Sequence, residues 1–213
     1  IADLIRYGQF VETRLADEDL FSLRTLTRFR TYLVESISDL KRKVVCILDQ
    51  VFPEYQSIFS NIFGRTSKEI LLQFSSPIDF ENISSETLAK LLAQLSRQKV
   101  GATKAEQLKA AASSSFGITF AQNSFTFQLK ALIEQISFIE NQVKETETEI
   151  SRIMEKLKSP ITTITGIGNV TGAAIISEIG DISKFDSPRK LVAFAGIDAS
   201  VTQSGEFEAT HNV

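Results

Sequence analysis

The sequence predicts an all-α protein, in which long heptad-patterned helices of a coiled coil carry a helical insert and precede a small helix-hairpin-helix-containing domain. Apolar residues recur in alternating steps of three and four along two long segments, which is the spacing of helices that pair along a seam. The chain contains only four prolines, and proline disfavours helix interiors. Residues 159–213 are instead rich in glycine and small side chains, which favours short helices joined by tight turns.

The composition limits the class of protein. Of the 213 residues 43% are apolar, enough for a real core, and the net charge of −3 does not by itself indicate a nucleic-acid binder. There is no run of 18 apolar residues and no signal-peptide pattern, so no membrane association is predicted. The single cysteine, Cys46, excludes an internal disulfide and fits a reducing cytoplasm.

The first long helix is predicted over residues 20–51, with Asp17 or Asp19 as its N-cap and Pro53 beyond its end. Residues 1–19 are expected to be the tail of an upstream domain, with a helix that Gly8 ends, and the sequence to be a fragment of a longer chain. The apolar seam of the first long helix consists of Leu26, Leu33, Ile37, Leu40, Val44, Ile47 and Val51.

The second long helix is predicted over residues 124–158, where steps of three and four continue without a break and only Thr146 is polar. Residues 20–158 therefore form a predicted coiled-coil region. Two short helices around Gly64 are followed by its insert, a helical hairpin over about residues 78–120. The seam could pair with the first long helix, antiparallel and with the insert at the tip, or with a second copy of the chain. Its members are Leu129, Leu132, Ile136, Ile139, Val143, Thr146, Ile150, Ile153 and Leu157.

A glycine-rich turn opens the C-terminal region. Gly166 and Gly168 flank Ile167, and a helix of small residues follows Asn169. Glycines permit a tight turn and leave the N–H groups of a helix start open to a phosphate. The pattern is typical of a helix-hairpin-helix, which holds a nucleic-acid backbone without reading its sequence. The alternative is a plain packing turn.

The charges near this turn do not favour nucleic acid. Residues 159–213 contain three basic and six acidic residues, so phosphate contacts would need backbone donors or a basic surface elsewhere. Between Arg24 and Lys43 the first long helix carries six basic residues against two acidic ones. That excess could supply the basic surface, although a solvated helix face is the more ordinary interpretation.

A series of short motifs follows in order between residues 166 and 205. The motifs are Gly166-Ile167-Gly168, Glu178-Ile179-Gly180-Asp181, Phe185, Ala195-Gly196 and Ser204-Gly205. Their order resembles the C-terminal transposase domain of one bacterial family, the DEDD-type insertion-sequence transposases (the IS one-ten family), also called bridge-RNA-guided serine recombinases. The coiled-coil region and the opening IADLIRYGQF resemble the family more loosely, so the resemblance covers the chain.

The resemblance implies an architecture and a set of partners. Residues 1–19 would be the tail of a RuvC-like domain, and residues 159–213 the serine transposase domain. The family's acidic ligands for a divalent metal, expected to be Mg²⁺, lie upstream of Ile1, so Asp3 is not expected to bind it and no metal ligand is predicted in this chain. The implied partners are DNA, a guide RNA and further copies of the chain in a dimer or tetramer. The implied location is the bacterial cytoplasm.

The resemblance also implies that Ser204 is the nucleophile, which attacks a DNA phosphate and becomes covalently linked to it. Gly205 would leave room for that phosphate. A serine hydroxyl needs activation, and His211 could take part, although a lone histidine is more often structural. Glu206 and Glu208 could bind metal, although such residues more often face solvent.

Three functions can be compared on these grounds. The leading hypothesis is a DNA transposase or site-specific recombinase, with this fragment alone inactive. The rival is a non-catalytic helix-hairpin-helix module that binds nucleic acid on a coiled-coil dimerisation stalk. A purely structural scaffold would explain the heptads but would leave the glycine turn and Ser204 without a role.

Overall fold

A computed structural model of the protein describes residue 6 and residues 17–98, 101–197, 199–204 and 207–212; of residues 199–204 and 207–212 it describes the backbone. The chain divides into two compact units. One consists of residues 1–27 and 150–213, and the other of residues 28–149. The predictions for Asp3 and for a helix ended by Gly8 concern residues outside the described part of the chain.

Two long helices form as predicted. Helix α2 spans Glu18–Val51 and α8 spans Gln122–Leu157. Of the two candidate caps it is Asp17 that caps α2, because its carboxylate accepts a hydrogen bond of 2.9 Å from the backbone N–H of Asp19. Among the residues described, no helix is both long and apolar enough to cross a membrane.

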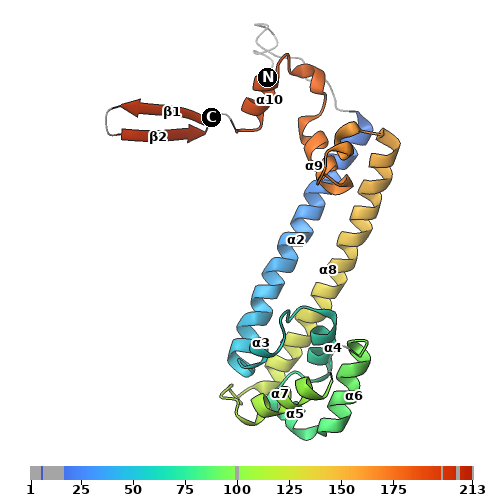
Figure 1. Ribbon diagram of the computed structural model, residues 1–213, viewed down its shortest axis with the longest axis vertical. Coiled ribbons are helices and arrows are strands. Elements are labelled where there is room, and N and C mark those ends of the chain that lie inside the picture. The colour runs from blue at the N-terminus through green and yellow to red at the C-terminus, as the bar shows by residue number, and fades with distance from the viewer. Residues whose placement is uncertain (1–5, 7–16, 99–100, 198, 205–206, 213) are drawn as a thin grey trace. The chain divides into compact units, whose positions relative to one another are not determined.

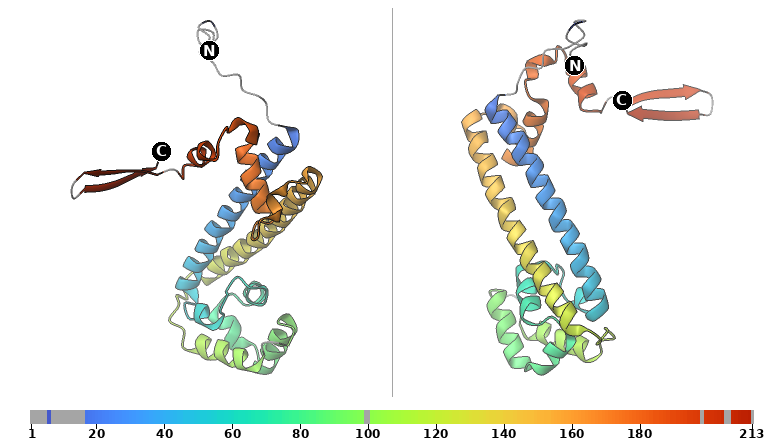
Figure 2. Two further views of the ribbon diagram at one scale, coloured as in Figure 1. Left: turned by 45° about the horizontal axis from the view of Figure 1, so that its top comes forward. Right: turned by 180° about the vertical axis from the view of Figure 1, so that it is seen from behind.

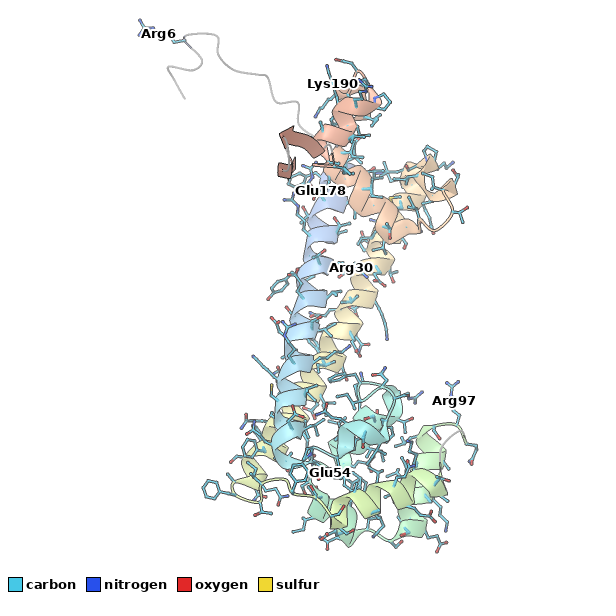
Figure 3. The ribbon with its side chains drawn as sticks, turned by 60° about the vertical axis from the view of Figure 1, so that its left-hand side comes forward. Arg6, Arg30, Glu54, Arg97, Glu178 and Lys190 are labelled. Atoms are coloured by element: carbon cyan, nitrogen blue, oxygen red, sulfur yellow. The ribbon has the colours of Figure 1, made fainter. Side chains whose placement is uncertain are left out.

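Within residues 28–149 the two long helices lie side by side and antiparallel (Figures 1 and 2). The Nε of Arg30 lies 2.7 Å from Glu147 Oε1, and Lys41 Nζ lies 4.0 Å from Glu140 Oε1, so residue numbers rise along one helix as they fall along the other. Figure 3 shows Arg30 on α2 beside α8. Of the two pairings left open by the seams, the chain adopts the intramolecular one. Pairing with a second copy stays a prediction.

The predicted seams are the buried faces of both helices. Every seam position is buried or half-buried, and Leu33, Val44, Leu129 and Ile136 have at most 4% of their surface exposed. Thr146, the one polar member, is also buried. Its hydroxyl stays hydrogen-bonded there, because it donates to the carbonyl of Gln142 in the preceding turn at 2.8 Å. The spacing therefore identified the packed face correctly.

Five short helices separate the long ones. They are α3 (Tyr55–Ile58), α4 (Arg65–Gln73), α5 (Pro77–Asn82), α6 (Ser85–Leu95) and α7 (Ala102–Ser113). Helices α6 and α7 pack together, which confirms the predicted hairpin. Helix α5 was not predicted, although Ser76, Pro77 and Asp79 form a capping box with proline in the first turn.

Aromatic side chains fill the core beneath these helices. The ring of Phe52, at the end of α2, lies 5.7 Å from that of Tyr55 and 5.6 Å from that of Phe80, and all three side chains are fully buried. Burial raises the pKa of the Tyr55 phenol well above its usual range, and its hydroxyl lies 2.9 Å from Ser67 Oγ. The buried phenol therefore stays neutral and hydrogen-bonded.

The other unit contains the C-terminal helices. They are η1 (Pro160–Thr163), α9 (Asn169–Ile179), η2 (Ile182–Lys184) and α10 (Pro188–Phe194), the last with Ser187 as its N-cap. Short helices joined by tight turns were expected here, and they are found. Residues near the start of α2 and the end of α8 share a core with α9, which consists of Leu23, Ile150, Ile153, Met154 and Ala173.

The helices confirm the all-α class, with one addition at the C-terminus. Strands β1 (Ala199–Ser204) and β2 (Phe207–Asn212) pair antiparallel as a hairpin. These strands were not predicted, because short helices joined by tight turns were expected throughout residues 159–213. The signal for strands is the β-branched pair Val201 and Thr202 before the loop and Phe207 after it.

Candidate nucleic-acid-binding turn and serine hairpin

The glycine turn has the geometry that its sequence predicts. Gly166 has a φ of +90°, which a residue with a side chain rarely adopts, and the N–H of Ile167 donates to the carbonyl of Ile164 at 3.0 Å. Gly168 is the N-cap of α9, and its carbonyl accepts the bond of 2.8 Å from the N–H of Gly172 that starts the helix. The chain therefore turns tightly and enters α9 directly.

The start of α9 is open. Gly166 and Gly168 are exposed, and a Cβ atom placed on either would meet no other atom within 4 Å. The φ of −85° at Gly168 is accessible to any residue, so neither backbone conformation nor packing requires glycine there. The predicted approach of a phosphate to this turn is therefore sterically possible.

Small residues let α9 pack closely, and a helix of such residues was predicted after Asn169. Ala173 and Ser177 are fully buried, and Ala174 is half-buried. The close packing at Gly172 was not predicted: a Cβ atom there would lie 2.9 Å from Ile161 Cγ2 and 3.4 Å from Met154 Cε. The sequence signal for this contact was the run of small residues after the turn.

We expect Gly172→Val to destabilise the protein by about 1–3 kcal/mol, because a side chain there overpacks the contact with Ile161. Thr171→Val is the matched control: it adds the same residue at the adjacent, exposed position and should change stability by less than about 0.5 kcal/mol. Urea unfolding followed by circular dichroism measures both. Equal stability of the two variants would show that α9 does not pack as described.

An arginine of α2 fixes the far end of α9. Arg24 Nε donates a hydrogen bond of 2.8 Å to the carbonyl of Ser177, and its guanidinium lies 3.7 Å from Glu178 Oε2. Carbonyls at a helix C-terminus lack helical partners, and a cation there also interacts favourably with the helix dipole. The sequence analysis missed this role, since it placed Arg24 in a basic face.

The basic face of α2 is largely committed to ion pairs within the protein. Besides Arg24, the side chain of Arg30 pairs with Glu147 at 2.7 Å, and Arg42 pairs with Asp39. These contacts favour the ordinary interpretation of those charges over a free surface for nucleic acid. The acidic residues from Glu145 to Glu149 in α8 were the sequence signal for such an ion pair, because they include Glu147.

Ser204 is the last residue of β1. In the hairpin register it pairs with Phe207, and the two residues between them, Gly205 and Glu206, lie outside the described residues. His211 pairs with Ser200, four positions along the ladder from the Ser204–Phe207 pair, which at about 3.3 Å per residue is about 13 Å. The register therefore does not bring His211 beside Ser204.

The described residues offer no set of metal ligands. Among them no three or more His, Cys, Asp or Glu residues gather in a way that could hold an ion. Glu208 pairs with Gln203 in the hairpin register, next to the Ser204–Phe207 pair, and Asp3 and Glu206 are not described. A divalent metal thus does not fit the described side chains, and we derive no reaction step through one.

Comparisons with protein-family models point to one class of protein, the transposases. Residues 158–213, which contain the glycine turn and Ser204, match the model described as Transposase IS116/IS110/IS902 family. Residues 1–53 match a second model described as Transposase, that of the DEDD transposases of the IS110 type. No curated protein and no solved structure matches the chain.

The two matched segments meet in one unit of the structure. Arg24 belongs to the first segment, and its partners Ser177 and Glu178 belong to the second. Leu23 of the first segment also shares a core with Ala173 of the second. Segments separated by a hundred residues of sequence therefore fold together.

Proposed function

We propose that this chain is part of a DNA transposase that moves insertion-sequence DNA, with Ser204 as the nucleophile. The observation that carries the proposal is the family match over residues 158–213, which includes both the glycine turn and Ser204. The position of Ser204 supports it, because the residue ends a strand beside the loop of a hairpin.

The proposed chemistry is the transfer of a phosphodiester to serine. Ser204 Oγ bonds to a DNA phosphorus, and the bond from that phosphorus to one bridging oxygen breaks. The serine proton passes to a base, and the released DNA oxygen is protonated. A hydroxyl of the second DNA strand then reverses the exchange, which joins the strands and restores the serine. Gly205 would leave space beside the attacking oxygen.

The glycine turn would hold the DNA backbone during this exchange. Its proposed contacts are with the turn Gly166, Ile167, Gly168 and Asn169 at the start of α9, where the helix dipole favours an anion. The donors would be backbone N–H groups other than that of Ile167, which is bonded to the carbonyl of Ile164. The open space at Gly166 and Gly168 supports this role. A net-acidic segment can bind phosphate in this way because the donors are backbone groups.

Further partners follow from the resemblance. We propose that a guide RNA selects the DNA target by base pairing and that copies of the chain assemble as dimers or tetramers through α2 and α8. The divalent metal, expected to be Mg²⁺, would be bound by acidic residues of the RuvC-like domain. The proposed place of action is the bacterial cytoplasm.

The second candidate is a non-catalytic module that binds nucleic acid through the same turn. The open start of α9 favours it, because binding there needs nothing from Ser204. It predicts association that high salt reverses, with no covalent product.

Reaction of two DNA molecules carrying insertion-sequence ends, with guide RNA and Mg²⁺, tests the proposal. We expect strand exchange from a protein in which the RuvC-like domain precedes Ile1, and loss of exchange when EDTA removes the metal. The 213-residue chain by itself should not cut DNA. Metal-dependent nicking by that chain would contradict the proposed division of labour.

A further inference from the structure

A charged hollow lies between α4 and α8 in the unit of residues 28–149. Its volume is about 370 Å³. Both helices contribute polar side chains to its wall, among them Arg65, Lys68, Ser137, Glu140, Asn141 and Lys144.

Two lysines, Lys68 in the wall of the hollow and Lys41 outside it, lie beside the carboxylate of Glu140. Lys68, whose side chain is only 15% exposed, donates hydrogen bonds of 2.6 Å to Glu140 Oε2 and 3.2 Å to Ser137 Oγ. Lys41 lies 4.0 Å from the other oxygen of Glu140 and 5.2 Å from the ring centre of Phe63. One carboxylate is therefore shared between two ammonium groups, which leaves positive charge in a partly desolvated place.

The rim adds further positive charge. Arg65 and Lys144 are exposed and line the opening, while Glu69 is the other acidic residue of the wall. With Lys68 the wall has three cations against two carboxylates. Residues 28–149 as a whole contain 14 basic and 14 acidic residues, so the excess is local to this hollow.

We propose that this hollow binds a phosphodiester group of nucleic acid, an inference that rests on the proposed function. Arg65 and Lys144 supply the charge that meets the phosphate, and Ser137 and Asn141 supply neutral hydrogen-bond donors beside it. The contacts of Lys68 with Ser137 and Glu140 join α4 to α8. Arg65 and Lys144 at the rim take no part in these contacts. The same chemistry serves DNA and RNA, which are separate arms of the test.

The test compares two double variants of the 213-residue chain. Arg65→Gln with Lys144→Gln removes the rim charges, and Lys90→Gln with Arg97→Gln removes the same charge from around α6. Lys90 and Arg97 are exposed, and Arg97 projects from the end of α6 (Figure 3). Fluorescence anisotropy measures binding to a single-stranded RNA and to a mixed-sequence DNA duplex, each about 30 nucleotides long, between about 50 and 200 mM KCl.

We expect the rim variant to bind at least about tenfold more weakly than the control variant to one or both probes. The slope of log K against log salt should become shallower by about 1–2. Arg65→Lys with Lys144→Arg should restore binding, which separates a charge contact from a folding defect. Equal effects of the rim and control variants, or binding of neither probe by the unmodified chain, would overturn the inference. Strand exchange through Ser204 is measured separately from anisotropy binding by the 213-residue chain, so failure of the hollow and failure of the proposed nucleophile are distinguishable.

Discussion

Ser204→Ala should abolish strand exchange by the complete transposase, with a loss of at least about 1,000-fold. A covalent mechanism has no substitute for its nucleophile, and enzymes that lose theirs fall by factors of this size or larger. Folding and nucleic-acid binding should persist, because the residue ends a strand and the substitution removes one hydroxyl. The measurement is strand exchange between two DNA molecules, with binding followed separately by anisotropy.

Ser200→Ala is the matched control for that experiment. Ser200 lies on the same strand, pairs with His211 and is not followed by glycine. We expect it to retain exchange within about threefold, because a serine that takes no part in the chemistry loses only local interactions. Undiminished exchange by Ser204→Ala, or loss in both variants alike, would reject Ser204 as the nucleophile.

Phe52→Ala should destabilise the protein by about 3–5 kcal/mol. The side chain is fully buried where α2 ends, and its ring packs against Tyr55 and Phe80. Truncation removes this apolar contact and leaves a cavity that the surrounding helices fill only in part. Typical domains are stable by about 5–15 kcal/mol, so the loss is a large part of the total. Urea unfolding at constant temperature measures it.

Phe120→Ala makes the same chemical change at a residue that is 85% exposed. Its effect should stay within about 0.5 kcal/mol, because little apolar surface is withdrawn from water there. Similar losses in both variants would mean that the aromatic core does not organise the short helices.

The long helices could be predicted from the sequence because each is specified by a repeated signal. A step of three or four residues recurs along each seam, and tertiary packing buries that same face. The predicted N-terminal boundary of α2 came from the candidate caps Asp17 and Asp19 and its C-terminal boundary from Pro53, and these residues act locally. The turn at Gly166 was predictable for a similar reason, since its positive φ depends on one residue.

Features that depend on distant residues could not be predicted in the same way. The contact of Arg24 with Ser177 joins positions 153 residues apart, and nothing near Arg24 in the sequence distinguishes it from Arg28 or Arg30. The distance of His211 from Ser204 follows from the hairpin register, which could not be anticipated because no strands were predicted there. The role of Ser204 came from family resemblance and that of the turn from its glycine pattern, and both remain proposals.

The most direct test of the central claim is to look for the covalent intermediate. The complete transposase is incubated with an insertion-sequence DNA end, guide RNA and Mg²⁺, then denatured, digested and analysed by mass spectrometry. Our account predicts a nucleotide linked through phosphate to the peptide that contains Ser204, and no such adduct in Ser204→Ala. An adduct on another residue, or efficient exchange with no protein–DNA adduct at any time point, would contradict it.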